Sequence, residues 1–252
     1  MRIANWQLRG DQFGALWDAS GQDRPPFPLS PMSSARTWGA FEYEQRRIQE
    51  AFAGQDRDSV RLAVRVLAEP EVFVEISGET VEKTPIRIIG AQLQRWCAIA
   101  VQEPGSTPAA GGDVVLGAGI TTDLAALLVG QIPQNAAGKR TFARNDVTED
   151  DYFSQNILRS AGAAGAAPKL EDAMRARYAG RGTMRVCQGP RHTRGELGVI
   201  RWLDVAGDGR YMIGPRDPNA AVLAGPQLVV STLESLIARG LRAQRELAEQ
   251  YW

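Results

Sequence analysis

Hydrophobic and polar positions along the chain follow two periods, and their order predicts a mixed α+β protein. Short apolar runs that end at Gly, Pro or polar residues indicate strands, at about 2–7, 72–76, 85–89, 96–101, 113–116, 183–187, 197–203 and 210–213. Apolar residues that recur every three or four positions indicate amphipathic helices, at about 11–17, 40–53, 57–68, 120–128, 148–157, 170–180 and 226–241. Because short turns join most of the strands, we expect an antiparallel sheet and not a doubly wound parallel one.

A unit near the end of the chain resembles an earlier one. In residues 196–237 an Asp208-Gly209 turn joins two strands, and a helix follows with Pro226 at its first position. In residues 71–132 three strands lead through Gly117-Ala118-Gly119, which we expect to be the joint to a similar helix. Two helices are predicted before each unit.

This repetition favours a diverged internal duplication. We expect a single domain over residues 1–252, made of two similar halves at about 1–134 and 135–252. The alternative is coincidence, because hairpins followed by helices are common in α+β proteins.

Composition and charge exclude several function classes. The chain has 44% hydrophobic and 23% charged residues, which is typical of a folded soluble domain, and 29 basic residues balance 29 acidic ones. Neither nucleic-acid binding nor an anionic membrane surface is therefore expected, since both need a basic face. No apolar run is long enough to cross a bilayer, and the first ten residues do not form a secretion signal, so we expect a cytoplasmic protein without membrane insertion. Cys97 and Cys187 lie in apolar strands and are expected to be buried, reduced thiols.

Motifs for catalysis, cofactors and metals are scarce. His192 is the only histidine, in a polar turn, so it is either a general base or simply a solvated loop residue, and with two separated cysteines it cannot complete an ordinary zinc site. Gly117-Ala118-Gly119 begins like a dinucleotide fingerprint but has Thr122 where the third glycine belongs. The acidic residues 149–151 are expected in a first helical turn, where the helix dipole favours them, and not around calcium. We expect no catalytic, cofactor-binding or metal-binding residues.

Several apolar patterns resemble those of the EspG family, the secretion-associated chaperones of actinobacterial type VII (ESX) systems. They are spread over nearly the whole chain: Trp-x-Leu and Phe-x-x-Leu-Trp at 6–17, Pro-Phe-Pro-Leu at 26–29, Leu-Ala-Glu-Pro-Glu-Val at 67–72 and Gly-Arg-Tyr at 209–211, followed by Gly-Pro and the closing helix. The resemblance implies a quasi-two-fold fold, with a central antiparallel β-sheet flanked by helical bundles. It also implies a cytosolic protein without enzyme activity that binds PE–PPE heterodimers and shields the apolar tip of the PPE subunit before export.

The same resemblance implies which residues contact the client. In the family the contact is made by the loop after the first long central strand, by the sheet face and by the C-terminal helices. The loop corresponds to Gly78–Thr84, which is shorter than in better-known members and puts the exact interface, or the client, in question. The implied contacts are Glu79, Thr80, Val81, Glu82, Lys83 and Thr84 in the loop, and Arg201, Leu203, Tyr211, Ile213, Leu236 and Arg239 on the sheet and the last helix, each of which is otherwise a core or solvent residue.

Two other function classes stay open from the sequence. One is a small hydrolase or transferase that uses carboxylates with Tyr or Arg, which a single histidine does not exclude. The other is a structural adaptor that dimerises through the repeated helices. Self-association of the free protein also stays open, because Trp252 ends the chain and is expected to cover a neighbouring surface or a second copy.

Overall fold

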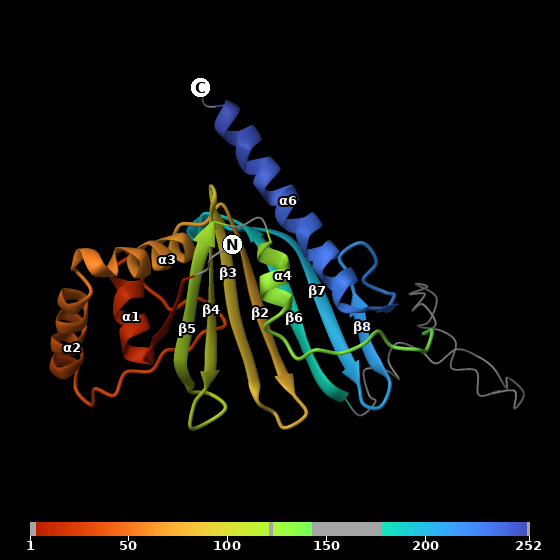
Figure 1. Ribbon diagram of the computed structural model, residues 1–252, viewed down its shortest axis with the longest axis horizontal. Coiled ribbons are helices and arrows are strands. Elements are labelled where there is room, and N and C mark those ends of the chain that lie inside the picture. Colours follow the sequence, from red (N-terminus) through yellow and green to blue (C-terminus); the bar gives the residue numbers. More distant parts are fainter. Residues whose placement is uncertain (1–3, 121–122, 143–177, 251–252) are drawn as a thin grey trace, which may run out of the picture.

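The computed structural model describes residues 4–120, 123–142 and 178–250 of the 252-residue chain. The described strands form one nine-stranded antiparallel sheet (Figure 1). They are β1 (Ala4–Leu8), β2 (Val72–Thr80), β3 (Pro85–Leu93), β4 (Trp96–Pro104), β5 (Gly111–Ile120), β6 (Tyr178–Gln188), β7 (Gly195–Val205), β8 (Gly209–Ile213) and β9 (Val222–Leu223). The helices are α1 (Gly10–Asp18), α2 (Trp38–Ala51), α3 (Asp58–Ala68), α4 (Leu124–Val129) and α6 (Pro226–Gln250), with short 3₁₀ turns at Gln55–Arg57 and Arg191–Thr193.

The strand order is β1-β5-β4-β3-β2-β6-β7-β8-β9. Hairpins join β2 to β3, β3 to β4, β4 to β5, β6 to β7 and β7 to β8, which confirms the expected antiparallel sheet. The centre of the sheet is the long antiparallel pair of β2 with β6, in which Val72 lies opposite Gln188 and Thr80 opposite Gly180.

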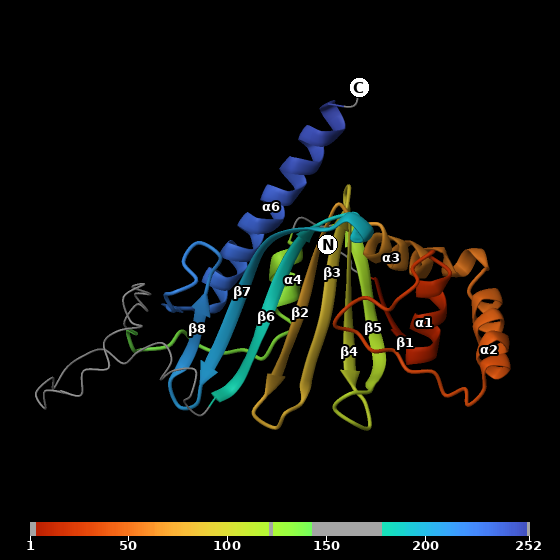
Figure 2. The same cartoon turned by 180° about the vertical axis from the view of Figure 1, so that it is seen from behind.

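Two hydrophobic cores lie on opposite faces of this sheet. On β2, Phe73 points into the core covered by α1 and α3, whereas Val72, Val74 and Ile76 point into the core covered by α4 and α6. This division follows from the alternation of side chains along a strand. Figures 1 and 2 show α1, α2 and α3 at the β5 end of the sheet and α6 at the β8 end.

The last helix forms as the sequence predicts. Pro226 is its first residue, and Val229, Leu233, Leu236 and Ile237 are all buried against the sheet. Their spacing places them on one face of a 3.6-residue helix. No helix among the described residues is long and apolar enough to cross a membrane.

Two expected boundaries are wrong. Gly117-Ala118-Gly119 lies inside β5 and not at a helix entry, because β1 and β4 both pair with this run and supply its backbone partners. Ile120, expected on a helix, ends the strand with 49% of its surface exposed, and the helix begins only at Leu124. Likewise Tyr178–Gly180, expected at the end of a helix, opens β6 because it pairs with β2 and β7.

The duplication stays a prediction. Each half contributes hairpin-linked strands to one side of the β2–β6 pair, followed by a helix. The helix predicted for 148–157 and residues 170–177 of the helix predicted for 170–180, which the comparison of the halves requires, lie outside the described residues. So do the acidic cluster 149–151 and Trp252. The flanking helical bundles and the single domain over residues 1–252 also stay predictions.

Candidate partner-binding surface

Among the described residues, no helix covers one face of the sheet over β6, β7 and the adjoining parts of β2 and β8. Ile76, Met184, Ile200 and Met212 point into the core under α4 and α6, so the residues that alternate with them point to the other side. In Figure 2 no described helix crosses this side of these strands. We call it the open sheet face, and define it by Ser77, Glu79, Arg181, Thr183, Arg201, Leu203, Tyr211 and Ile213.

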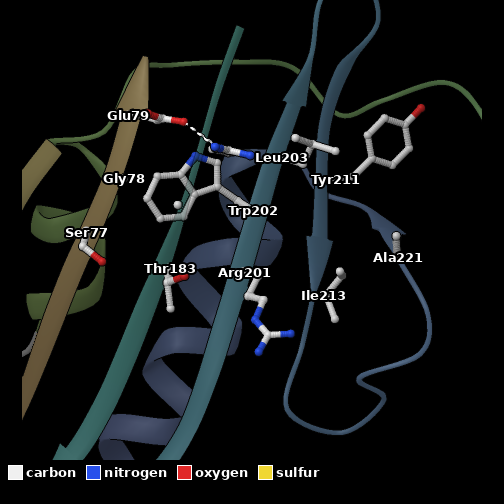
Figure 3. A pocket seen from close by; sticks show the side chains of 12 residues that line it. Ser77, Gly78, Glu79, Thr183, Arg201, Trp202, Leu203, Tyr211, Ile213 and Ala221 are labelled. Carbon is white, nitrogen blue, oxygen red and sulfur yellow. Dashed lines mark hydrogen bonds and ion pairs between the residues drawn. The ribbon is translucent and has the colours of Figure 1, made fainter. Parts of the chain in front are cut away.

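These residues line a hollow of about 410 Å³, together with Gly78, Gly182, Trp202 and Ala221 (Figure 3). The strand register arranges the open sheet face in two rows across four strands. One row is Glu79, Arg181, Leu203 and Tyr211, and the other is Ser77, Thr183, Arg201 and Ile213. The surface is therefore mixed, with charged groups toward β2 and β6 and apolar groups toward β8.

The floor of the hollow depends on two glycines. Gly78 and Gly182 lie on neighbouring strands beside the Trp202 ring, and a Cβ at Gly182 would fall 2.0 Å from a ring carbon. Any larger residue there would displace the indole. Trp202 itself is 3% exposed and packs in the core under α6.

The β2–β3 hairpin borders the hollow, and its loop is shorter than the sequence suggested. β2 continues to Thr80 and β3 begins at Pro85, so only residues 81–84 lie outside the strands. Pairing of Glu79 and Thr80 with β6 explains the longer strand. Val81 donates its backbone N–H to Ala179 O at 3.0 Å, and its side chain is 45% exposed at the tip of the hairpin.

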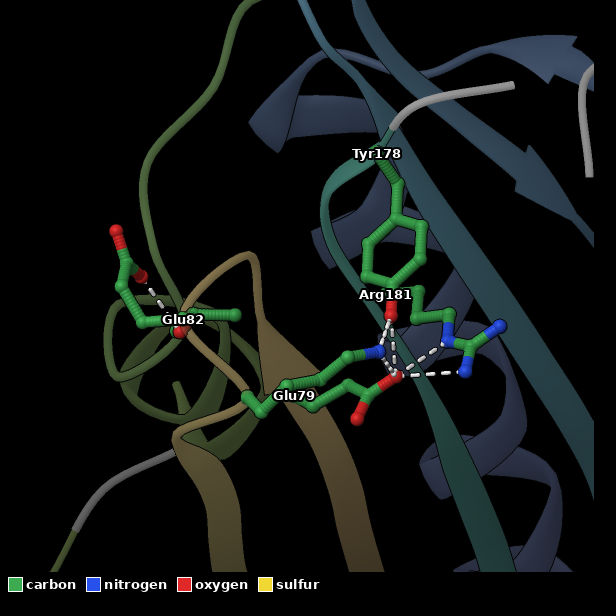
Figure 4. A network of polar contacts seen from close by, with 6 residues as sticks. Glu79, Glu82, Tyr178 and Arg181 are labelled. Carbon is green, nitrogen blue, oxygen red and sulfur yellow. Dashed lines mark hydrogen bonds and ion pairs between the residues drawn. The ribbon is translucent and has the colours of Figure 1, made fainter. Parts of the chain in front are cut away.

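A polar cluster around Glu79 fastens this hairpin to β6 (Figure 4). Glu79 Oε1 accepts hydrogen bonds from Tyr178 Oη at 2.7 Å, Lys83 Nζ at 3.1 Å and Arg181 Nε at 2.8 Å. Lys83 Nζ also donates to Tyr178 Oη, and the Arg181 guanidinium lies 4.6 Å from the Tyr178 ring centroid. These donors, Tyr178 first and then Lys83 and Arg181, lower the pKa of Glu79 to about 2.

An ion cluster around the buried Glu75 bounds the open sheet face on the side of α3. Glu75 is 2% exposed, and Arg194, Arg185 and Arg191 approach its carboxylate at 3.4, 3.7 and 3.8 Å. Burial raises the pKa of Glu75, against the opposing effect of the three arginines. Burial also lowers the pKa of Arg191 to about 10, and this side chain donates to Leu67 O at 2.7 Å and so ties α3 to the sheet.

Tyr211 supports the surface from within. It is 2% exposed, its hydroxyl donates to Asp208 Oδ2 at 2.7 Å and accepts from the backbone N–H of Arg140 at 2.9 Å, and the Phe142 ring packs edge-on at 4.7 Å. Burial, followed by the bond to Asp208, raises the pKa of Tyr211. Its aromatic ring therefore holds residues 138–142 against β8.

The implied contact residues fall on two sides of the sheet. Arg201 is exposed and Leu203 and Ile213 are half-buried on the open sheet face, close to the hairpin. Leu236 lies on the other side, in the core under α6, and is 5% exposed. Arg239 is on the same helix, is exposed, and donates to Leu197 O.

Sequence reasoning missed Ser77, Arg181 and Thr183. Arg181 and Thr183 flank Gly182 on β6. The sequence predicts this strand only from Thr183, so Arg181 falls outside it and the face of Thr183 is not assigned. The alternation of Thr183, Arg185 and Cys187 with Met184 and Val186 carried a strand signal that extends back to Arg181.

Other chemistry is sparse in the described part of the chain. Cys97 and Cys187 are both buried, as expected, and neither forms a disulfide bond. Burial raises the pKa of Cys187 to about 11. His192 lies exposed in the 3₁₀ turn after β6. No group of three His, Cys, Asp or Glu side chains among the described residues is arranged to hold a metal ion.

Comparison with models of protein families gives a match. A family model described as the EspG family, with the label ESX-1, matches residues 9–226, which is most of the chain. A search of curated proteins finds no match.

Proposed function

The chain belongs to the EspG family, which is associated with ESX secretion, and on this premise we propose that it is a chaperone for PE–PPE heterodimers that binds the apolar PPE tip on the open sheet face. The observation that carries the proposal is that no described helix covers this face, on which Leu203 and Ile213 are half-buried; the hairpin that borders it exposes Val81. A solvent-facing hollow lined by apolar side chains and arginines suits a protein partner, because apolar contacts supply affinity and a charged rim supplies orientation.

The beta hairpin is the second support. Glu79 and Lys83 are engaged within the cluster of Figure 4, so they hold the hairpin in place and leave Val81 as its apolar contact. A hairpin held rigid before binding loses less entropy when the partner docks. Glu79 and Lys83 therefore anchor the short loop, and Val81 is left to contact the client.

The titratable groups of the hollow do not favour acid–base chemistry. Glu79 is the only carboxylate among the described residues that line it, and a pKa of about 2 keeps that group ionised and hydrogen-bonded at neutral pH. A general acid or base needs a pKa near the working pH. The geometry therefore favours binding over a carboxylate-dependent hydrolase or transferase.

Co-expression with each PE–PPE pair from the same source tests the proposal. We expect a 1:1:1 complex by size-exclusion chromatography with mass determination. Leu203→Glu and Ile213→Glu should each weaken the complex by about tenfold or more, because each places a charge in an apolar contact. Ile120→Glu is the matched control. Ile120 is an exposed apolar residue on β5, near the opposite end of the strand order from β7 and β8.

His192→Ala should leave the complex intact, because this side chain lies in an exposed turn outside the hollow. Elution of this chain apart from every pair would contradict the chaperone proposal. A complex that tolerates both charged substitutions would instead contradict the assigned face.

A further inference from the structure

A second hollow lies along α6, between this helix and the segment that joins β8 to β9. Its volume is about 750 Å³. We call it the α6 groove; Leu228, Thr232, Ser235, Arg239 and Arg242 line it from the helix. Met212, whose side chain lies in the α6 core, also borders it, so the groove is on the opposite side of the sheet from the open sheet face.

The helix residues of the groove form a stripe separate from the one that packs on the sheet. From Leu228 to Arg242 they follow one another at steps of four, three, four and three residues. This spacing is the seam along which a second helix packs lengthwise. Thr232 donates its hydroxyl to Leu228 O at 2.7 Å, so it needs no other partner and its small side chain permits close approach.

The two ends of the groove differ in chemistry. At one end Leu228 and Val222 are 39% and 44% exposed. Toward the other end of the helix lie Arg239 and Arg242, and the β8–β9 segment adds Arg216 together with Asp217, the one acid among the described lining residues. Arg216 and Arg242 form no ion pair with another described residue.

Among the described residues no acid forms an ion pair with Arg216, Arg239 or Arg242, although Glu246 lies four residues after Arg242 on α6. Glu196 lines the neighbouring hollow, but its carboxylate pairs with Arg185 at 3.0 Å on the open side. The arginine end therefore has an excess of positive charge within a chain of zero net charge. A local excess of this kind attracts acidic groups.

We propose that the α6 groove binds an amphipathic helix of a second protein, with apolar residues against Leu228 and Val222 and acidic residues against Arg216, Arg239 and Arg242. The spacing fits a helix, the exposed apolar end provides burial, and the arginines fix the direction of the partner helix. This site lies on the opposite side of the sheet from the proposed client site, so Arg239, which the resemblance implies as a client contact, is assigned here to a different partner. Both can be occupied at the same time.

Fluorescence anisotropy with labelled synthetic peptides tests the proposal on the full chain. The probe is an amphipathic helix with Leu along one face and Glu clustered at one end; its counterpart has Lys in place of Glu. We expect the Glu peptide to bind, more weakly at high salt, and the Lys peptide not to bind. Arg216→Glu with Arg242→Glu should weaken the Glu peptide by about tenfold or more.

Arg245→Glu is the matched control, since Arg245 is an exposed arginine one turn further along α6 and outside the groove. It should change the affinity by less than about twofold, as exposed charges away from a contact do. Leu228→Glu should abolish binding of the Glu peptide, because it places a charge in the apolar end of the groove. Circular dichroism checks that each variant is folded.

Several results would overturn the proposal. These are equal binding of the Glu and Lys peptides, loss of affinity in Arg245→Glu equal to that of the groove variants, or competition between the Glu peptide and a bound PE–PPE pair. Binding of anionic vesicles or of DNA that the groove variants abolish would assign the arginines to another ligand class. Dissociation of a homodimer by the same variants would make a second copy the occupant.

Discussion

Single residues fix the shape of the open sheet face. Gly78 and Gly182 leave the space that the Trp202 ring occupies, because a Cβ would lie 3.0 and 2.0 Å from ring carbons. Val81 stays exposed at the hairpin tip because Glu79, Lys83 and Tyr178 bond to one another beneath it.

Gly182→Ala should lower the free energy of unfolding by about 3 kcal/mol, because the new methyl group forces the buried indole to move. Urea unfolding followed by tryptophan fluorescence measures the loss. Gly195→Ala is the control, since a Cβ at this strand residue meets nothing within 4 Å. Equal effects of the two substitutions would mean that the tight contact with Trp202 does not exist.

Glu79→Gln should loosen the β2–β3 hairpin at a cost of about 1 kcal/mol, because the interactions lost are partly exposed. The folded-state pKa of about 2 lies below that of an unfolded glutamate, so the stabilisation is present above about pH 4.3 and is lost as the pH falls toward 2.

Wild type and Glu79→Gln should therefore converge in stability between pH 4 and 2, and hydrogen exchange at residues 81–84 should be faster in the variant at neutral pH. Glu82→Gln is the control, since Glu82 accepts only the Thr80 hydroxyl within the cluster. A pH-independent difference between wild type and Glu79→Gln would contradict the assigned cluster.

At the scale of elements, strand β8 is held by a buried ion pair. Arg210 donates to both oxygens of Asp204, at 2.7 and 2.8 Å, and both side chains are almost fully buried. Arg210 Nη2 also donates to Pro133 O at 2.6 Å, and its backbone bonds to Ala136 and Gly138. Arg210 therefore holds residues 133–138, which follow α4, against β8.

Asp204→Ala should destabilise the protein by about 3–5 kcal/mol, because it leaves the buried guanidinium without its counter-charge. Thermal and urea unfolding measure the effect. Glu103→Ala on β4 is the control, since Glu103 is an exposed strand carboxylate. A loss below about 1 kcal/mol, the range of exposed pairs, would show that Arg210 is not buried as described.

The sequence predicts helices and strands correctly where a single hydrophobic period dominates the segment. The 3.6-residue stripe of α6 and the Asp208-Gly209 hairpin are found where expected. The prediction fails at Gly117–Gly119 and Tyr178–Gly180, where pairing with two neighbouring strands overrides local glycine and helix signals. Strand register is a long-range property, so the rows that join Arg181 to Leu203 could not be derived from local patterns.

At the scale of the whole molecule, the sheet couples two cores. β2 contributes Phe73 to one core and Val74 to the other, so neither core can lose its packing without disturbing the strand that they share. Unfolding by urea should therefore be one transition, with the same midpoint by far-UV circular dichroism and by tryptophan fluorescence. Two separate midpoints would contradict the coupling and the expected single domain.

Docking of the client on the open sheet face can be tested by site-specific photo-crosslinking. A photoreactive amino acid is placed at position 203, 213, 120 or 228 of this chain in complex with a PE–PPE pair. We expect crosslinks to the PPE subunit from positions 203 and 213, and none from position 120 or from position 228 in the α6 groove. Crosslinks to PPE from 228 with none from 203 and 213 would contradict it.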